Sequence, residues 1–505
     1  MDKRKSLLNV TVSVFFKIAT MIVVIFTRRV LIQQCGNEVN GLNSLYASII
    51  GMLAVAELGV GSAITFCMYK PIVEENYAQV SALYQLFRKI YAGIGLIVLA
   101  CGLAITPFMR YFAKDYAQLD VNFQLTFLLM LASVVTSYFF GAKSALINAF
   151  KNNYITNAIS SSGLLLEYVL EIVALLATHS YTWYLSCKVI SSLVQWVVTT
   201  RIAGRKYGTI MAHKEAIEPE TRKTLTRSIK AMFIHKIGGA LVNSADSVII
   251  SAFVGVIALG EYSNYTSIST VMAGILGLVF SSLTSILGHV YVGNTKEVTK
   301  QYSDAFHLIN FLIGLVFYMG YYAIVDNLIA ILFSPDLVVE KSISFVITMN
   351  GFVQFMRNST LTFRDATGAF YHDRWKPLIE GATNVILSIW FVHWMGVTGV
   401  IAATILTNLL ICHVVEPYVL YKDALEMSPK TYYVKNYAMI ALFAVLLLVL
   451  DRVMVHYDSQ WMELLVNGCI SVALSAVGCV VAAGIDRSST RFIIRKFSGA
   501  IKGML

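Results

Sequence analysis

The chain consists largely of long apolar segments separated by short polar breaks. An α-helix needs about 20 mostly apolar residues to cross the roughly 30 Å hydrocarbon core of a bilayer. Fourteen segments qualify when charged and Pro/Gly-containing stretches are taken as boundaries. They are 8–32, 42–68, 86–109, 122–147, 154–178, 181–203, 229–253, 259–290, 305–333, 343–370, 377–396, 398–420, 434–456 and 460–484. The pattern predicts an all-α polytopic membrane protein with about 14 transmembrane helices.

The composition excludes a water-soluble fold. Of 505 residues, 57% are hydrophobic and only 13% are charged, whereas soluble domains carry roughly 25% charged residues. The seven cysteines include no C-x-x-C pair, so neither a disulfide framework nor a zinc site is indicated. The excess of basic residues, +10 in total, is ordinary for a membrane protein and does not suggest nucleic-acid binding.

The basic residues also predict how the chain is oriented. With the N-terminus inside, 29 Lys and Arg fall on the cytoplasmic side, six outside and four within spans. This asymmetry follows the positive-inside rule and supports cytoplasmic N- and C-termini. One missed or invented span would destroy the alternation.

An internal repeat relates the two halves of the chain. A shift of 219 residues aligns 17–65 with 236–284 without a gap, and 13 of the 49 pairs are identical. The offset carries the first span onto the seventh, so each repeat holds six spans and both copies enter the membrane from the same side. Parallel repeats of this kind are typical of transporters whose two lobes rock about a central cavity.

The repeat and the polar breaks predict five regions. These are an N-terminal lobe (1–203), a cytoplasmic linker (204–228), a C-terminal lobe (229–420), two further spans (434–484) and a cytoplasmic tail (485–505). The external connections are short, which leaves no room for the catalytic loop expected of a membrane glycosyltransferase or polymerase.

Basic residues inside spans are the first candidates for a substrate site. A charge at mid-span costs about 2.5–3.5 kcal/mol on insertion scales, so it should face protein or water. Lys17, Arg28, Lys236 and Arg357 are such residues, and Arg can engage two phosphate oxygens at once. The alternative is that these groups form structural ion pairs, for instance Lys17 with Glu57.

Acidic residues inside spans are candidates for ion coupling or for structural pairing. Glu167 and Glu171 lie four residues apart and share one helix face; they could bind a coupling proton or Na⁺. The alternative is that Lys188, on the next helix, neutralises them. Glu57 and Asp246 complete the acidic set. No organic cofactor and no metal site is expected, and no nucleotide-binding or hydrolase motif occurs in the sequence.

Three stretches of the sequence resemble polysaccharide flippases of the O-antigen (Wzx-like) type, in the multidrug/oligosaccharidyl-lipid/polysaccharide (MOP) exporter superfamily. The first is 28–42 with LAVAELGVGSAI (53–64) and YKP (69–71). The second is NSADSVIIS (243–251) with GEYSNY (260–265). The third is RDATGAFYHDRWKP (364–377) with Glu380 and Asn384. The pair Cys35-Gly36 departs from the Leu-Gly common in that family.

The resemblance implies a MATE-like two-lobe fold and alternating access. By position, Arg28, Glu57, Lys70, Asp246 and Arg364 match polar positions of the family. The implied substrate is an undecaprenyl-diphosphate-linked oligosaccharide, moved from the inner to the outer leaflet of a bacterial inner membrane without a covalent step. The expected partners are this lipid, membrane lipids, and a glycan polymerase or other envelope-synthesis proteins.

Three alternatives stay open at this point. A cation-coupled multidrug exporter would use the same scaffold with a more acidic cavity. A membrane glycosyltransferase or polymerase would need an external catalytic loop. A scaffolding subunit of an envelope-synthesis complex would tolerate replacement of every buried charge.

Overall fold

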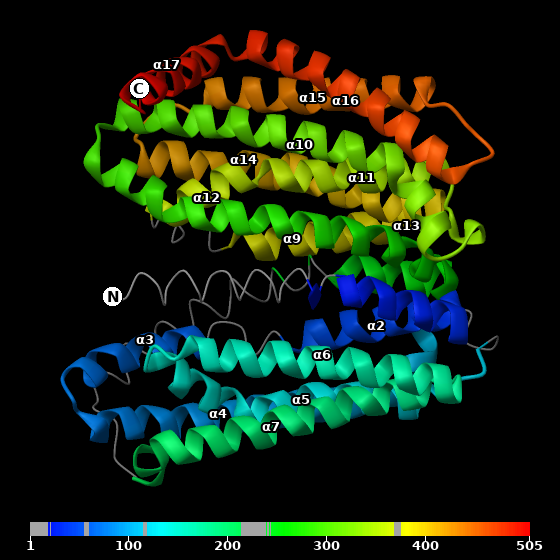
Figure 1. Cartoon of the computed structure of the whole chain (residues 1–505), viewed down its shortest axis with the longest axis vertical. Helices are drawn as coiled ribbons and strands as arrows, with labels where there is room; N and C mark the ends of the chain where they lie inside the picture. Colours follow the sequence, from blue (N-terminus) through cyan, green and yellow to red (C-terminus); the bar gives the residue numbers. More distant parts are fainter. Residues whose placement is uncertain are drawn as a thin grey trace. The chain divides into compact units, whose positions relative to one another are not determined.

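The structure is a computed structural model that describes residues 19–20, 22–54, 60–114, 119–213, 239, 242, 244–367 and 375–504 (Figure 1). These residues are almost entirely helical and contain no strand, so the predicted all-α class is confirmed. The chain forms two compact units, 1–260 and 261–505. The five regions expected from the sequence stay predictions.

In the part of the first unit that the structure describes, six helices from α2 to α7 follow one another along the chain. They are α2 (Asn37–Leu53), α3 (Val60–Val73), α4 (Tyr77–Ile105), α5 (Phe123–Ala149), α6 (Asn153–Thr178) and α7 (Tyr181–Ala212). Residues 22–35 are also helical, a 3₁₀ turn (Thr106–Tyr111) continues α4, and a π-turn (Ile250–Val254) precedes α9. Helices α5, α6 and α7 pack together, and α4 packs on α5.

The second unit contains the helices from α9 onward. They are α9 (Val256–Gly293), which begins in the first unit, α10 (Lys296–Leu332), α11 (Lys341–Met356), α12 (Asn358–Thr367), α13 (Lys376–Thr407), α14 (His413–Tyr418), α15 (Lys430–Val453), α16 (Gln460–Ile485) and α17 (Arg487–Met504). A 3₁₀ turn (Pro335–Leu337) follows α10, and two π-turns, Asn408–Cys412 and Val419–Ala424, flank α14.

Seven helical segments of the described chain are long and apolar enough to cross a membrane, and several agree with predicted spans within a few residues. The longest, Lys376–Ala424, contains two predicted spans, 377–396 and 398–420. The Asn384 amide donates to Thr404 Oγ1 over 2.8 Å, although a straight helix would place residues this far apart about 30 Å from each other. The chain therefore reverses between them, at Gly396, whose φ of 55° suits glycine.

Equivalent residues of the sequence repeat adopt matching structures. Gly36 and Gly255 both have positive φ, 91° and 148°, and each directly precedes a helix, α2 or α9. Tyr46 and Tyr265 are both fully buried. The Tyr46 hydroxyl donates to the Phe123 carbonyl at the start of α5, and the Tyr265 hydroxyl accepts from the backbone N–H of Val339 just before α11. The structure thus supports a true duplication.

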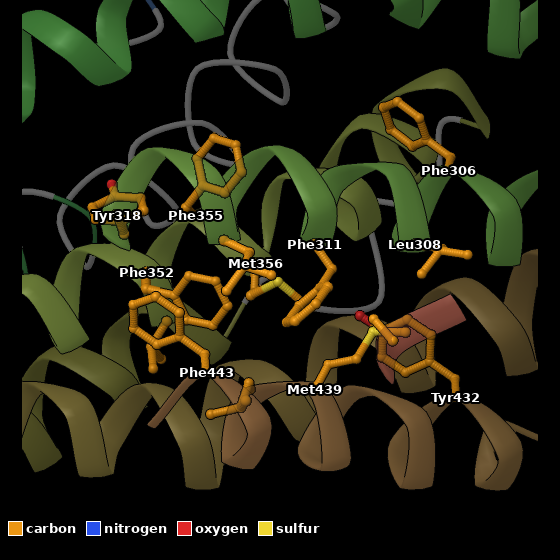
Figure 2. Packing of buried hydrophobic residues seen from close by; sticks show 14 of the residues in the cluster. Phe306, Leu308, Phe311, Tyr318, Phe352, Phe355, Met356, Tyr432, Met439 and Phe443 are labelled. Atoms are coloured by element: carbon orange, nitrogen blue, oxygen red, sulfur yellow. The ribbon is translucent and has the colours of Figure 1, made fainter. Parts of the chain in front are cut away.

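The core of the second unit is aromatic (Figure 2). Phe352 on α11 stacks on Phe443 of α15, with ring centroids 3.6 Å apart. Phe280 of α9 meets Phe355 edge-on at 5.6 Å. Burial of such large rings stabilises the packing of α9, α10, α11 and α15, and this rigid core supports the polar cluster described next.

Candidate functional site

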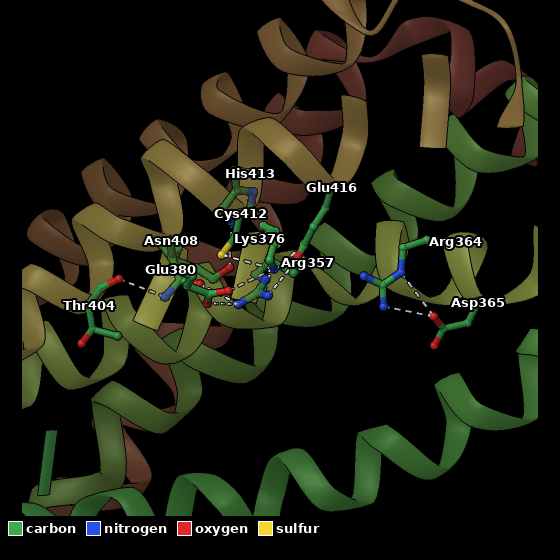
Figure 3. Close-up of polar contacts among 11 residues, drawn as sticks. Arg357, Arg364, Asp365, Lys376, Glu380, Thr404, Asn408, Cys412, His413 and Glu416 are labelled. Carbon is green, nitrogen blue, oxygen red and sulfur yellow. Dashed lines mark hydrogen bonds and ion pairs between the residues drawn. The ribbon is translucent and has the colours of Figure 1, made fainter. Parts of the chain in front are cut away.

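A buried ionic cluster lies where α11 and α12 meet (Figure 3). Arg357 occupies the single residue between these helices. Its guanidinium donates two hydrogen bonds to the Glu416 carboxylate, from Nη2 to Oε1 over 2.6 Å and from Nε to Oε2 over 3.1 Å. Nη1 also donates to Asn408 Oδ1 over 2.7 Å. Two-pronged, charge-assisted contacts of this kind are the strong class of hydrogen bonds.

A second cation completes the cluster. Lys376, in the first turn of α13, pairs with Glu380 one turn later, Nζ to Oε2 at 3.0 Å, and also contacts Glu416. Glu380 in turn lies 3.4 Å from Arg357. The Glu416 side chain is only 1% exposed, so its charge needs both cations. Two positive and two negative groups leave the cluster electrically balanced.

The reversal at Gly396 brings these residues together. It places Glu380 of α13 near Asn408 and Glu416, which lie after the turn, and Arg357 bridges all three. The cluster therefore links the two helical segments on either side of Gly396 to the junction of α11 and α12. Arg357 and Lys376 match the charges of its two carboxylates.

The first unit contains a separate ion triad. Lys188 of α7 lies 2.9 Å from Glu167 and 2.7 Å from Glu171, both on α6. Glu171 is fully buried, and its contact with Lys188 is ionic rather than a well-directed hydrogen bond. The shared helix face predicted for the two glutamates is confirmed. The pairing is the neutralisation by Lys188 that the sequence offered as the alternative to ion coupling.

The remaining predicted residues are spread over both units. Arg28 is half-buried on the helical stretch 22–35, and Asp246 is buried just before the π-turn. Lys70 is exposed at the end of α3 and lies 3.8 Å from Glu74. Arg364 is buried on α12, lies 3.2 Å from Asp365, and sits apart from the Arg357 cluster (Figure 3). Lys17, Lys236 and Glu57 lie outside the described residues.

Glu416 and Lys376 were not among the candidates taken from the sequence. Glu416 lies inside the predicted span 398–420, and that position was the signal that could have identified it. Lys376 belongs to the flippase-like stretch 364–377 and to the basic residues on the predicted cytoplasmic side. Within the described part of the chain, no group of three metal-ligating side chains comes together.

Comparisons with known proteins address the fold. No protein-family model matches the sequence, and a search of curated proteins finds no match. Among solved structures, lipid II flippase MurJ in an inward closed conformation matches with a TM-score of 0.66 and 14% identity, over 94% of this chain and 99% of that one.

Two transporters of the MOP superfamily are also similar. An inward-facing multidrug resistance MATE family transporter has a TM-score of 0.59 and 15% identity, over 80% of this chain and 95% of that one. A MOP superfamily transporter from Pyrococcus furiosus, whose binding pocket is described as reversed in polarity, has a TM-score of 0.52 and 15% identity over 85% and 98%. The chain is a multi-pass membrane protein with the fold of MOP superfamily transporters.

Proposed function

We propose that this protein is a flippase that moves an undecaprenyl-diphosphate-linked oligosaccharide from the inner to the outer leaflet of a bacterial cytoplasmic membrane. The observation that carries the proposal is the similarity in fold to a lipid II flippase over nearly the full length of both chains. The three sequence stretches that resemble O-antigen type flippases support the choice of a glycan lipid. Transport proceeds by alternating access and changes no covalent bond.

Arg28 is the residue we assign to the diphosphate. It is half-buried and lies on a helical stretch of the repeat's first span, and a guanidinium can engage two phosphate oxygens together. Lys17 and Lys236 are proposed as further cations for the same group, with Lys70 and Arg364 as contacts for the substrate near the predicted cytoplasmic boundary.

Arg357 is the weakest member of the proposed substrate set. Its guanidinium already engages Glu416 and Asn408, so a phosphate would have to displace a buried carboxylate. A substrate role for Arg357 therefore requires the cluster to open during transport.

The test is leaflet exchange in proteoliposomes. Purified protein is reconstituted with a fluorescent undecaprenyl-diphosphate oligosaccharide, and a lectin added outside reports lipid that reaches the outer leaflet. Arg28→Ala should slow exchange about tenfold or more, because a hydrogen bond to a charged group contributes about 1.5–3 kcal/mol. Arg205→Ala, at an exposed position on α7, is the control and should leave the rate unchanged. Normal exchange by Arg28→Ala would remove the assignment of the diphosphate to this residue.

A cation-coupled multidrug exporter is the second candidate. The carboxylates of Glu167 and the fully buried Glu171 favour it, since release of Lys188 would let them take up a proton or Na⁺ during the cycle. The same proteoliposomes, loaded with a cationic dye and given a pH or Na⁺ gradient, distinguish the two. Gradient-driven dye transport without glycan-lipid exchange would favour the exporter.

A further inference from the structure

A pocket of about 480 Å³ opens between α4, α5 and α7 of the first unit. Its size falls within the range of about 300–1,000 Å³ usual for small-ligand sites. Helix α4 contributes Tyr84 and Arg88 one turn apart, α5 contributes Tyr138 and Lys143, and α7 contributes Trp196 among others. None of its lining residues belongs to either ion cluster described above.

The described wall of the pocket is positively charged. Arg88 and Lys143 line it, and none of the described lining residues is Asp or Glu. The two cations therefore lie on the wall of one pocket. The Lys143 ammonium donates to Thr200 Oγ1 over 2.7 Å, and an ammonium has two further N–H donors. The positive charge and the N–H donors of this pocket therefore favour the binding of an anion.

Aromatic rings form the rest of the wall. Trp196 is 38% exposed and lies near the exposed ring of Phe139, with centroids 6.4 Å apart. Met211, near the end of α7, also lines the pocket, and Gln85 Nε2 donates to the Met211 carbonyl over 2.7 Å. Indole and phenol rings beside basic groups are typical of the membrane–water interface, where one end of a ligand is apolar and the other charged.

The predicted topology places this pocket at the cytoplasmic boundary of the membrane. Arg88 lies two residues inside the start of the predicted span 86–109, and Lys143 lies four residues before the end of the span 122–147. Basic pockets between transmembrane helices on this side bind the head groups of anionic lipids. The opening lined by Phe139 and Trp196 suits acyl chains.

We propose that the Arg88–Lys143 pocket binds the phosphate of an anionic inner-leaflet phospholipid. Arg88 and Lys143 hold the phosphate oxygens, and Trp196 and Phe139 contact the upper acyl chains. This binding is separate from translocation and does not depend on the proposed function.

Bromine-labelled lipids test the proposal, because bromine quenches nearby tryptophan fluorescence. The full-length protein is placed in phosphatidylcholine nanodiscs that contain increasing shares of phosphatidylglycerol brominated in its acyl chains. The quenching assigned to Trp196 is the difference between the wild type and Trp196→Phe. Wild type should reach half-quenching at a low share of phosphatidylglycerol, and brominated phosphatidylcholine should quench less.

Matched charge variants decide the outcome. Arg88→Gln with Lys143→Gln should raise the phosphatidylglycerol needed roughly twentyfold, since each basic residue near the surface accounts for about a fivefold change. Lys89→Gln with Arg205→Gln removes two exposed charges from α4 and α7, which also line the pocket, at positions outside it, and should have no such effect. Arg88→Lys with Lys143→Arg keeps the charge and should retain binding, which separates loss of the site from misfolding.

Two results would overturn the proposal. One is equal quenching in the pocket variant and the exposed-charge control. The other is displacement of the label by undecaprenyl diphosphate but not by unlabelled phosphatidylglycerol, since the pocket would then belong to the transported lipid.

Discussion

Removal of Lys188 should strongly destabilise the first unit. Lys188→Met leaves Glu167 and the fully buried Glu171 without their cation. Breaking a buried ion pair from one side costs about 3–5 kcal/mol. We expect a marked fall in the melting temperature of the purified protein. Intrinsic fluorescence of the protein in detergent measures this temperature.

A rescue variant separates lost charge pairing from lost packing. Lys188→Met combined with Glu167→Gln and Glu171→Gln removes all three charges and should recover most of the melting temperature. Lys206→Met, at an exposed position further along α7, is the matched control and should change it little. A triple variant no more stable than Lys188→Met alone would contradict the ionic explanation.

The sequence identified individual buried charges better than their partners. Glu167, Glu171 and Lys188 lie on consecutive helices, so their meeting could be anticipated from chain order. Arg357 was recognised as a charge within an apolar segment, but Glu416 lies 59 residues away. Their pairing depends on the reversal of the chain at Gly396 and on the packing of α13 against α11. Neither feature can be predicted from the residues near Arg357 or Glu416 alone.

At the scale of helices, the contact between α2 and the start of α9 depends on glycine. A Cβ on Gly41 would lie 2.0 Å from the Val256 carbonyl oxygen, and one on Gly260 would lie 2.5 Å from the Asn37 carbonyl oxygen. Both obstacles are backbone atoms, which cannot rotate aside. Asn40 also donates to the Gly260 carbonyl over 3.4 Å across the same contact. The two glycines are equivalent positions of the repeat.

Gly41→Ala should therefore destabilise the protein by about 1–3 kcal/mol, the usual cost of overpacking. Gly93→Ala on α4 is the control, because its Cβ would meet nothing within 4 Å and alanine favours a helix by about 1 kcal/mol. The measurement is the melting temperature of both variants beside the wild type. A Gly41→Ala protein as stable as Gly93→Ala would mean that α2 and α9 are not in close contact.

The sequence predicts a cytoplasmic tail (485–505) where the structure has α17, and Asp486 explains how this helix begins. Its carboxylate accepts from the Ser489 backbone N–H over 3.1 Å and from Lys435 Nζ over 2.8 Å. Burial would raise the pKa of Asp486, but hydrogen bonds from Lys435, Ser488 and Ser489 outweigh it and hold the pKa below its ordinary value. The charged carboxylate thus caps α17 and anchors it to α15.

This lowered pKa predicts how α17 responds to pH. A carboxyl group with a lower pKa in the folded state stabilises it above the unfolded pKa of about 3.9, and the stabilisation is lost as pH falls through the folded value. Hydrogen exchange in the α17 amides should therefore stay constant from about pH 7 to 5 and speed up, after correction for intrinsic rates, below about 4. Asp486→Asn should weaken protection at neutral pH and flatten this response. Equal profiles for both proteins would rule out the carboxylate as the anchor.

At the scale of the whole chain, the sequence predicted the helical class and most helix limits, because apolar length and breaks are local properties. The break between predicted spans at 396–398 was located correctly, since Gly396 marks it. The sequence predicts fourteen membrane crossings, whereas seven helical segments of the described chain are long and apolar enough to cross a membrane. The predicted count rests on the alternation of basic loops, and a membrane experiment can test it.

Single cysteines in loops far apart provide that experiment. The seven native cysteines are all free and are first replaced by Ser or Ala. Ser180→Cys, between α6 and α7, and Asp458→Cys, between α15 and α16, should both react with a membrane-impermeant maleimide added to intact cells. Lys151→Cys and Asn294→Cys, in loops predicted to be cytoplasmic, should react only after lysis. Because Ser180 and Asp458 are separated by an even number of predicted crossings, one wrong span between them would put them on opposite sides, and labelling of only one would refute the fourteen-span topology.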